Sequence, residues 1–303
     1  MKIFYWLRPL VLVIGLLLHN SCNNKAETKK EKDEEPTPVS LRSTDYDLVK
    51  PVKGWALSDS LAEISGITFL QNKRLIAIED LRPLLYEIKL GDSAGVIVNK
   101  LEFRETDKEK FDFEDVAAIG DTVYALWSHG AIFKIVNQKK GAASDRRKTW
   151  LTKDNNTEGL AYDPVSGNLL VACKDDAGLE DVKKTTRAIY EFDIKADSLK
   201  RDPFMLIKKN DFENVAGEKI DFYPAAIGIH PVSHDIYIIS TKDTKCIAQF
   251  SHDGKLMAFD YLGKDMLPQP EGICFDANGN LYISTQARHG KPAYIYEFRL
   301  KTN

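Results

Sequence analysis

Short apolar runs alternate with turn residues along the chain from about residue 46 to its end. A typical unit opens on residues 158–161 (EGLA), passes through a polar turn at residues 163–168 (DPVSGN) and enters a second apolar run at residues 169–172 (LLVA). A third run, residues 189–192 (IYEF), alternates large apolar side chains with polar ones, and a weaker fourth run ends most units. Runs of this kind, bounded by Pro, Gly, Asn and Asp, predict β-strands.

Five such units follow one another. Their opening runs are spaced 49, 44, 67 and 46 residues apart and begin at Ser65, Glu114, Glu158, Ala225 and Glu271. A repeat of about 40–50 residues with four short strands is typical of a propeller blade. The sequence therefore predicts an all-β fold, a five-bladed β-propeller with four antiparallel strands per blade. Six blades are the alternative, since one spacing is long, but no sixth opening run lies within it.

The last unit lacks its fourth strand, because the chain stops at Asn303, soon after the third run at residues 295–298. The missing strand must come from elsewhere in the chain if the ring is to close. Residues 46–49 (YDLV) precede the first unit, and we predict that they pair beside residues 295–298. An N-terminal strand that closes the last blade hides two sheet edges at once.

The first 22 residues have the pattern of a bacterial lipoprotein signal peptide. Lys2 and Arg8 flank the start of an apolar core, residues 9–18, which has about the length of a secretory core and is too short to span a bilayer. Cys22 follows this core closely, and we predict that it is the lipidated lipobox cysteine. Ordinary signal cleavage without lipid is the alternative, but the small-x-small motif of such cleavage sites is absent here.

Residues 23–43 are rich in Lys, Glu and Pro and poor in apolar residues. Such a segment cannot bury enough surface to fold, so it predicts a disordered, charged tether. Residues 44–303 then form one propeller domain. A lipid on Cys22 holds this propeller to a lipid bilayer, which predicts the cell envelope as its location, at the outer membrane and facing the periplasm or the surface.

The net charge and the cysteine content indicate which partners are excluded and whether the cysteines form disulfides. The net charge is −3 and no predicted strand carries a run of Lys or Arg, which argues against a nucleic-acid partner. Without the lipobox residue, three cysteines remain, Cys173, Cys246 and Cys274. Three thiols cannot form a complete intramolecular disulfide framework, and all lie in or at the end of predicted strands. We therefore expect free, buried thiols.

Three motifs resemble the SdiA-regulated family of bacterial envelope proteins. They are residues 63–67 (EISGI), 156–163 (NTEGLAYD) and 268–273 (PQPEGI), and the resemblance extends from about Tyr46 to the C-terminus. It implies a five-bladed propeller and a calcium site, while no reaction is established for the family. The fourth unit departs from the family pattern, because Ala225 and Ala226 stand where a polar residue is possible.

The opening residues of the units also predict a metal site. In a propeller, the innermost strands begin at one mouth of the central channel, so the first residues of the five runs form a ring. Carboxylates in such a ring repel one another unless protons or a cation compensate, and calcium accepts oxygen ligands in irregular geometry. The ring carboxylates are Glu114, Glu158 and Glu271; further candidate ligands are Glu63, Asp115 and Asp80. Alternatively, each glutamate meets a backbone amide or an arginine.

Two classes of function follow. The first is a calcium-binding, envelope-tethered binding or scaffold module with an unknown protein or small-molecule ligand at the channel mouth. The alternative is a metal-dependent hydrolase of an ester, a lactone or a phosphate. The predicted mouth is rich in glutamate and carries few histidines, such as His129 and His289. No catalytic residue is identified, so the pattern favours the binding module.

Overall fold

The computed structural model describes residues 42–70, 74–104, 110–138 and 141–301. The predicted signal peptide, the lipidation site Cys22 and the tether up to residue 41 lie outside these ranges. No helix within the described ranges is long and apolar enough to cross a membrane.

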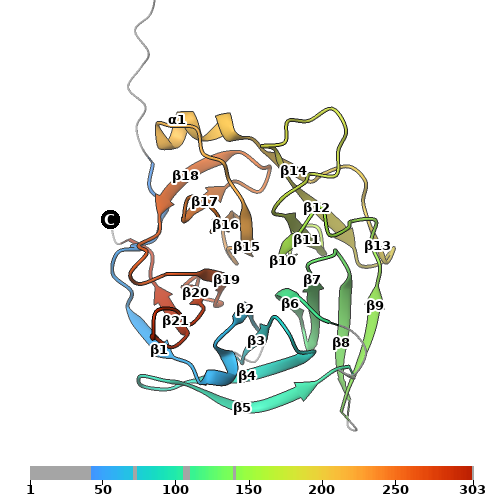
Figure 1. Cartoon of the computed structure of the whole chain (residues 1–303), viewed down its shortest axis with the longest axis vertical. Coiled ribbons are helices and arrows are strands. Elements are labelled where there is room, and N and C mark those ends of the chain that lie inside the picture. Colours follow the sequence, from blue (N-terminus) through green and yellow to red (C-terminus); the bar gives the residue numbers. More distant parts are fainter. Residues whose placement is uncertain (1–41, 71–73, 105–109, 139–140, 302–303) are drawn as a thin grey trace, which may run out of the picture. The chain divides into compact units, whose positions relative to one another are not determined.

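Five antiparallel sheets surround a central channel, and each sheet is one blade (Figure 1). Blade 1 contains β2 (Ile64–Phe69), β3 (Leu75–Glu79), β4 (Leu84–Leu90) and β5 (Gly95–Glu102). Blade 2 contains β6 (Phe113–Ile119), β7 (Thr122–Trp127), β8 (Ile132–Gln138) and β9 (Gly141–Arg147). Blade 3 contains β10 (Thr157–Asp163), β11 (Asn168–Cys173), β12 (Arg187–Asp193), β13 (Ser198–Leu199) and β14 (Met205–Ile207).

Blade 4 contains β15 (Pro224–Ile229), β16 (Ile236–Ser240), β17 (Cys246–Phe250) and β18 (Leu256–Tyr261). Blade 5 contains β19 (Pro270–Phe275), β20 (Leu281–Thr285), β21 (Tyr294–Phe298) and the N-terminal β1 (Lys53–Ala56). The short helices are η1 (Asp59–Leu61), η2 (Lys209–Phe212) and α1 (Glu213–Ala216). The predicted five-bladed, all-β fold is therefore confirmed.

The long spacing between the third and fourth units does not hold a sixth blade. Two loops account for it: residues 174–186 connect β11 to β12, and residues 208–223 carry η2 and α1. In blade 3 both β13 and β14 pair with β12, so these two short strands share the outermost position.

An N-terminal strand closes blade 5, as predicted, but the predicted residues 46–49 are wrong. β1 pairs with β21, with Lys53 opposite Glu297 and Ala56 opposite Tyr294. Tyr46 instead forms an isolated bridge with Leu300, beyond the end of β21. The reason is packing: Tyr46 is fully buried against the rings of blades 4 and 5, whereas the neighbouring Val49 is 91% exposed. The aromatic ring that β1 supplies to the core belongs to Trp55.

Contacts of the propeller begin within the segment assigned to the tether. The carbonyl oxygen of Arg42 accepts a hydrogen bond from Phe259 N–H at 2.8 Å. The Thr44 hydroxyl donates to Asp260 Oδ2 at 2.6 Å, and Lys301 Nζ donates to the Thr44 carbonyl at 2.7 Å. These bonds hold the start of the domain against β18 and the C-terminal residues.

The core lies between the blades, since every blade packs both of its faces against its neighbours. Middle strands such as β3 and β16 are therefore buried along their whole length, whereas the outer strand β5 is largely exposed. Each large apolar side chain buried in this way contributes roughly 1.5–3 kcal/mol. The three cysteines are free and buried within this packing, as predicted.

Candidate cation site at the channel mouth

A β-bulge displaces the opening residue of every innermost strand. The strand register shifts between Ile64 and Ile67, Phe113 and Asp115, Thr157 and Gly159, Pro224 and Ala226, and Pro270 and Gly272. The extra residues include the predicted ring members Ser65, Glu114, Glu158, Ala225 and Glu271. Because a bulge re-aims a side chain and leaves its residue unpaired, these five positions are set apart from the ladders below them.

The three predicted glutamates come together at this mouth. Glu158 interacts electrostatically with both Glu114 and Glu271. Glu158 itself is only 6% exposed. The shared column that the repeats predict is therefore a real cluster of carboxylates on β6, β10 and β19.

One lysine enters this cluster, and sequence reasoning missed it. Lys174 Nζ donates to Glu158 Oε2 at 2.5 Å, while Asn156 Nδ2 donates to Glu158 Oε1 at 2.9 Å. The same ammonium also attracts the carboxylates of Glu114 and Glu271. Lys174 directly follows β11, whose end opens on the same mouth as the start of β10. That position is the signal by which it could have been found.

The charge of Lys174 does not neutralise the whole cluster. Burial raises the pKa of Glu158 to about 7, against the opposing effect of Lys174. Burial raises the pKa of Glu114 well above its ordinary range, and the carboxylates of Glu158 and Asp112 raise it further. The pKa of Glu271 is also raised by burial. Carboxylates with such raised pKa values favour either a proton or an added cation.

The partners of the acidic side chains at the mouth differ between the blades. On blades 1 and 2, serine hydroxyls hold the carboxylates: Ser65 Oγ donates to Asp80 Oδ1 at 2.5 Å and Ser128 Oγ to Asp112 Oδ2 at 2.7 Å. Burial raises the pKa of Asp80 to about 6, and the carboxylate of Asp112 contributes to this shift. On blade 1 the neighbouring Glu79 pairs with Arg82, whereas Asp80 and Asp112 are held by hydroxyls, so the excess negative charge lies near Asp80, Asp112 and Glu114.

On blades 3 to 5, lysines accompany the acidic groups. Besides the pair made by Lys174, Lys242 Nζ lies 3.4 Å from Asp175 Oδ1. Lys245 attracts Glu271 from blade 4. This arc is therefore closer to neutral than the arc of blades 1 and 2.

The two remaining predicted ligands lie in different settings. Glu63 is exposed just before β2, and its charge reaches Asp80, so it belongs to the edge of the mouth. Asp115 is fully buried, and its oxygens accept the N–H groups of Val116 and Leu160, each at 2.8 Å. The backbone of Ile227 also donates to this carboxylate. Asp115 thus ties β6, β10 and β15 together below the mouth and is not brought to the glutamate cluster.

The donor set suits calcium in chemistry, since hard cations take carboxylate and hydroxyl oxygens. The arrangement is less suited, because Lys174 occupies the carboxylate of Glu158. Within the described residues, no group of three or more His, Cys, Asp and Glu side chains has an arrangement that could hold a metal ion. The calcium site therefore stays a prediction.

Comparison with known sequences places the chain in a family. The sequence pattern of the SdiA-regulated family matches residues 40–299, which is most of the chain. The chain belongs to the SdiA-regulated family. A search of curated proteins finds no match.

Solved structures that resemble this SdiA-regulated propeller share its fold at low sequence identity. Glutaminyl cyclase from Myxococcus xanthus superposes with a TM-score of 0.57 at 13% identity, covering 83% of this chain and 96% of the cyclase. The calcium structure of a carbohydrate-active enzyme from Trichoderma reesei gives 0.51 at 11% identity, covering 88% and 98% of the two chains. The PQQ-bound aldose sugar dehydrogenase from Streptomyces coelicolor gives 0.50 at 12%, covering 84% and 98%. Enzymes therefore occur on this architecture, but the architecture alone assigns no activity.

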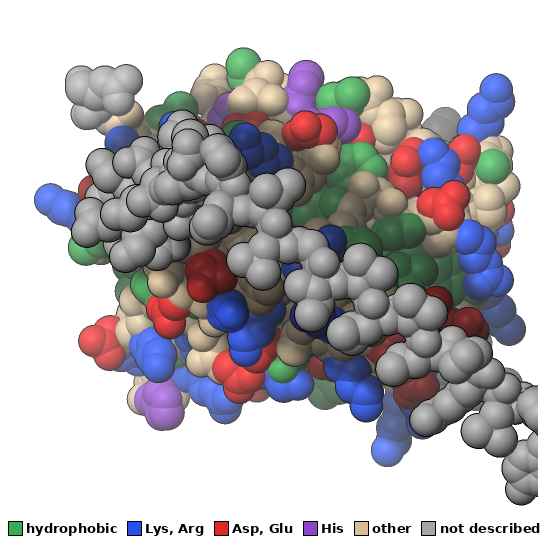
Figure 2. Space-filling view, turned by 90° about the horizontal axis from the view of Figure 1, so that it is seen from above, with side chains coloured by type: hydrophobic (Ala, Val, Ile, Leu, Met, Phe, Trp, Pro, Cys, Tyr) green, Lys and Arg blue, Asp and Glu red, His purple; other side chains and the backbone are tan. Residues whose placement is uncertain are grey.

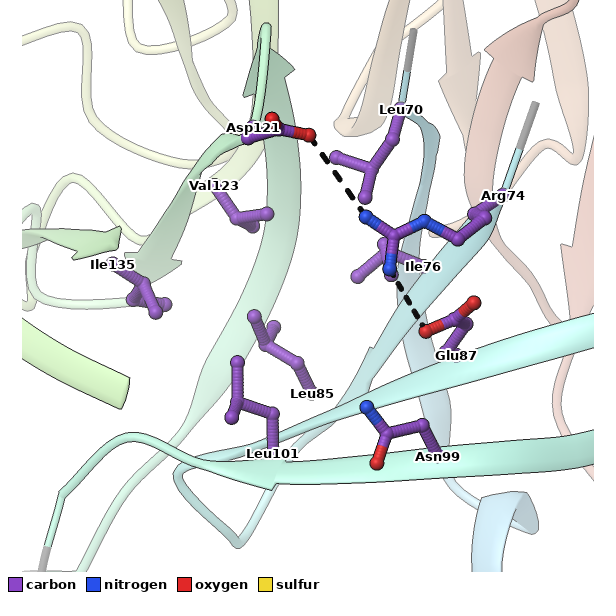
Figure 3. A pocket seen from close by; sticks show the side chains of 10 residues that line it. All are labelled: Leu70, Arg74, Ile76, Leu85, Glu87, Asn99, Leu101, Asp121, Val123 and Ile135. Atoms are coloured by element: carbon purple, nitrogen blue, oxygen red, sulfur yellow. Dashed lines mark hydrogen bonds and ion pairs between the residues drawn. The ribbon is translucent and has the colours of Figure 1, made fainter. Parts of the chain in front are cut away.

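A hollow of about 320 Å³ lies between blades 1 and 2 of the SdiA-regulated propeller, away from the glutamate ring (Figure 3). Its floor is aliphatic, and Arg74 spans its rim, 3.1 Å from Glu87 and 3.9 Å from Asp121. The Arg74–Asp121 ion pair joins the two blades, whereas the Arg74–Glu87 pair lies within blade 1. On the face drawn in Figure 2, Lys and Arg side chains are interspersed with Asp and Glu. At the channel mouth, in contrast, acidic side chains gather near Glu114.

Proposed function

We propose that this chain is an envelope-tethered lipoprotein whose propeller acts as a binding module, with a cation-binding site at the acidic mouth and calcium as its metal. The observation that carries the proposal is the excess of carboxylates over Lys174 in the ring of the buried Glu158 and the half-buried Glu114 and Glu271. A bound cation relieves this repulsion, and it lowers the pKa values that burial raises.

The position of Lys174 points to one side of the ring. Since this ammonium compensates Glu158, a further cation is drawn most strongly to Glu114 and to Asp80 and Asp112 on blades 1 and 2. Carboxylate and serine oxygens there are ligands of the kind that calcium accepts. The ligand that the module binds, a protein or a small molecule, then contacts this cation at the mouth.

The anchoring part of the proposal rests on the sequence before the propeller. The apolar core of residues 9–18 and the cysteine at position 22 support lipid attachment, and the charged residues 23–43 support a tether. We place the propeller in the cell envelope, at the outer membrane, bound to the bilayer through its N-terminal lipid.

Thermal unfolding tests the cation site. The full chain carrying Cys22→Ser is melted in calcium and in chelator, so that no detergent is needed. At calcium a hundredfold above its Kd, mass action adds about 2.7 kcal/mol to the free energy of unfolding. For a domain of this size that raises the Tm by about 5 °C. The triple variant with Gln at positions 114, 158 and 271 is expected to lose this response and keep its fold.

A matched control separates the site from general charge effects. Three exposed glutamates elsewhere are changed to Gln together, namely Glu102, Glu180 and Glu213. This variant is expected to respond to calcium like the parent chain. Equal melting of the parent chain in calcium and in chelator, with no metal found by elemental analysis, contradicts the proposal.

A second candidate is a metal-dependent hydrolase of an ester, a lactone or a phosphate. One observation favours it: a carboxyl with a pKa of about 7 beside Lys174 is suited to general acid–base catalysis near neutral pH. The same preparation is screened on ester, lactone and phosphate substrates. Turnover that Glu158→Gln abolishes supports the hydrolase, and no turnover of any substrate supports the binding module.

A further inference from the structure

A second opening lies at the other end of the channel, and we call it the lower mouth. A hollow of about 480 Å³ is lined there by residues of blades 1, 2, 4 and 5. It shares Phe69, Ala118 and Phe275 with a hollow of about 150 Å³ inside the channel. The two hollows therefore adjoin, at the end of the channel that lies away from the glutamate ring.

The lower mouth is separated from the acidic mouth. Phe69, Ala118 and Phe275 of the lower mouth lie four residues after ring positions of the same strands, about 13 Å at 3.3 Å per residue. Between the two mouths lies the layer of Asp115, where a Cβ added to Gly66 would lie 2.3 Å from its Oδ1. A Cβ added to Gly272 in the same layer would lie 2.6 Å from the Ser65 carbonyl oxygen. The chain is so close-packed there that a ligand in the lower mouth cannot reach the glutamates.

The floor of the lower mouth is aromatic. Phe69 meets the ring of Tyr282 edge-on, with centroids 5.0 Å apart, and both line the hollow. Phe69 and Phe275 are half-buried although they pack against the core, so part of each ring faces the open space. Further apolar side chains complete the wall, namely Leu70, Leu90, Ala118, Pro231 and Ala277. The volume is in the range of small-molecule sites.

Apart from the Tyr282 hydroxyl on β20, the polar side chains of the larger hollow lie on one turn, between β19 and β20. Asp276 Oδ1 accepts the N–H groups of Asn278 and Asn280, each at 2.9 Å, and its Oδ2 accepts Asn280 Nδ2 at 2.8 Å. These bonds fix the carboxylate in place, and each of its oxygens has two acceptor positions, so Oδ2 can take one more donor. Asp276 and Asn278 also line the hollow.

The charge and polarity of the side chains that line the hollow indicate which kind of ligand fits it. It contains no Lys, Arg or His among the residues that the structure describes around the hollow, so an anion finds no counter-charge there. A sugar carries hydroxyls on every side, whereas the polar side chains of the larger hollow, Asp276, Asn278 and Tyr282, come from one turn and the strand that follows it. A flat, mainly apolar ring with one hydrogen-bond donor matches both the aromatic floor and this turn.

We propose that the lower mouth is a binding site for a small aromatic molecule that carries one hydroxyl or amine donor. The ring lies against Phe69, Phe275 and Tyr282, and its donor bonds to the carboxylate of Asp276. This site is independent of the cation site and does not rest on the function proposed for it.

Ligand-observed NMR titrations test this site with four probes. 4-Methylphenol has the ring and the donor, toluene lacks the donor, benzoate is anionic and glucose is a sugar. The protein is the full chain carrying Cys22→Ser. We expect saturable binding of 4-methylphenol, about tenfold tighter than toluene, because a hydrogen bond to a charged acceptor has that effect. Benzoate and glucose are expected to bind more weakly than either.

Two variants obstruct the hollow from different sides. Ala118→Phe adds a ring where the two hollows adjoin, and Ala277→Trp covers the opening from an exposed turn, where folding is not disturbed. Each is expected to weaken 4-methylphenol binding at least tenfold. The matched control is Val165→Trp on the equivalent turn of blade 3, which is exposed and outside the lining. It is expected to bind like the parent chain.

Some results overturn the proposal. They are absence of saturable 4-methylphenol binding by the parent chain, tighter binding of benzoate or glucose, and unchanged binding by folded Ala277→Trp. Far-UV circular dichroism melting shows which variants are folded. If Ala118→Phe fails to fold, Ala277→Trp alone decides the outcome.

Discussion

Replacing Asp115 is the change that most directly tests how the channel is held together. Its carboxylate accepts backbone N–H groups from β6, β10 and β15. In Asp115→Ala these three amides lose their acceptor in a fully buried place. An unsatisfied buried amide costs about 1–3 kcal/mol. Part of this loss is offset, because the variant no longer has to bury a polar carboxyl group. We expect the free energy of unfolding to fall by about 3–6 kcal/mol, a large share of the stability of a typical domain.

Urea unfolding followed by circular dichroism measures this change on the full chain carrying Cys22→Ser. Asp115→Asn is the graded comparison, since it keeps the shape and one acceptor oxygen, and it is expected to lose about half as much. Glu114→Gln is the neighbouring control, because its side chain belongs to the mouth. Losses below about 1 kcal/mol in both Asp115 variants would refute the idea that this residue ties three strands together.

Two further predictions concern pH and anchoring. Because the pKa of Glu158 is raised from 4.5 to about 7, its contribution to stability is full below pH 4.5 and is lost as pH rises through 7, by up to about 3 kcal/mol. Urea midpoints measured from pH 4.5 to 8 are expected to show this fall in the parent chain and a flatter profile in Glu158→Gln; equal slopes contradict it. Cys22→Ser is expected to move the exported protein from the membrane to the soluble fraction and to abolish fatty-acid labelling, since the lipid is its expected anchor. Equal labelling of both forms contradicts that prediction.

The fold was predictable because a propeller repeats its hydrophobic pattern. The opening runs at Glu158 and Glu271 and the turns that follow them are enough to align the blades. The closing strand was harder to find. By composition, residues 46–49 resemble a strand more than β1 does, because β1 contains Gly54. Pairing depends instead on which residues lie beside β21, and these are residues 53–56. Within them, Trp55 supplies the aromatic side chain that is buried in the core.

The site was predictable only in part. The repeat identifies Glu114, Glu158 and Glu271 as members of one column, and they do converge. Lys174 lies outside that column, since it reaches the ring from the loop after β11. A repeat alignment compares equivalent positions, so it does not reveal a side chain that occurs in one blade and extends toward another.

Glu114 and Asp115 show how adjacent acidic residues acquire different roles. In a regular strand, consecutive side chains point to opposite faces, so one of the two would face away from the channel. The bulge between Phe113 and Asp115 removes Glu114 from the ladder and leaves it at the mouth. Asp115 re-enters the ladder, and Gly66 opposite it leaves room for the carboxylate. The bulge therefore makes the acidic mouth compatible with a closed channel, because the residue that supplies charge and the residue that seals the strands occupy successive positions.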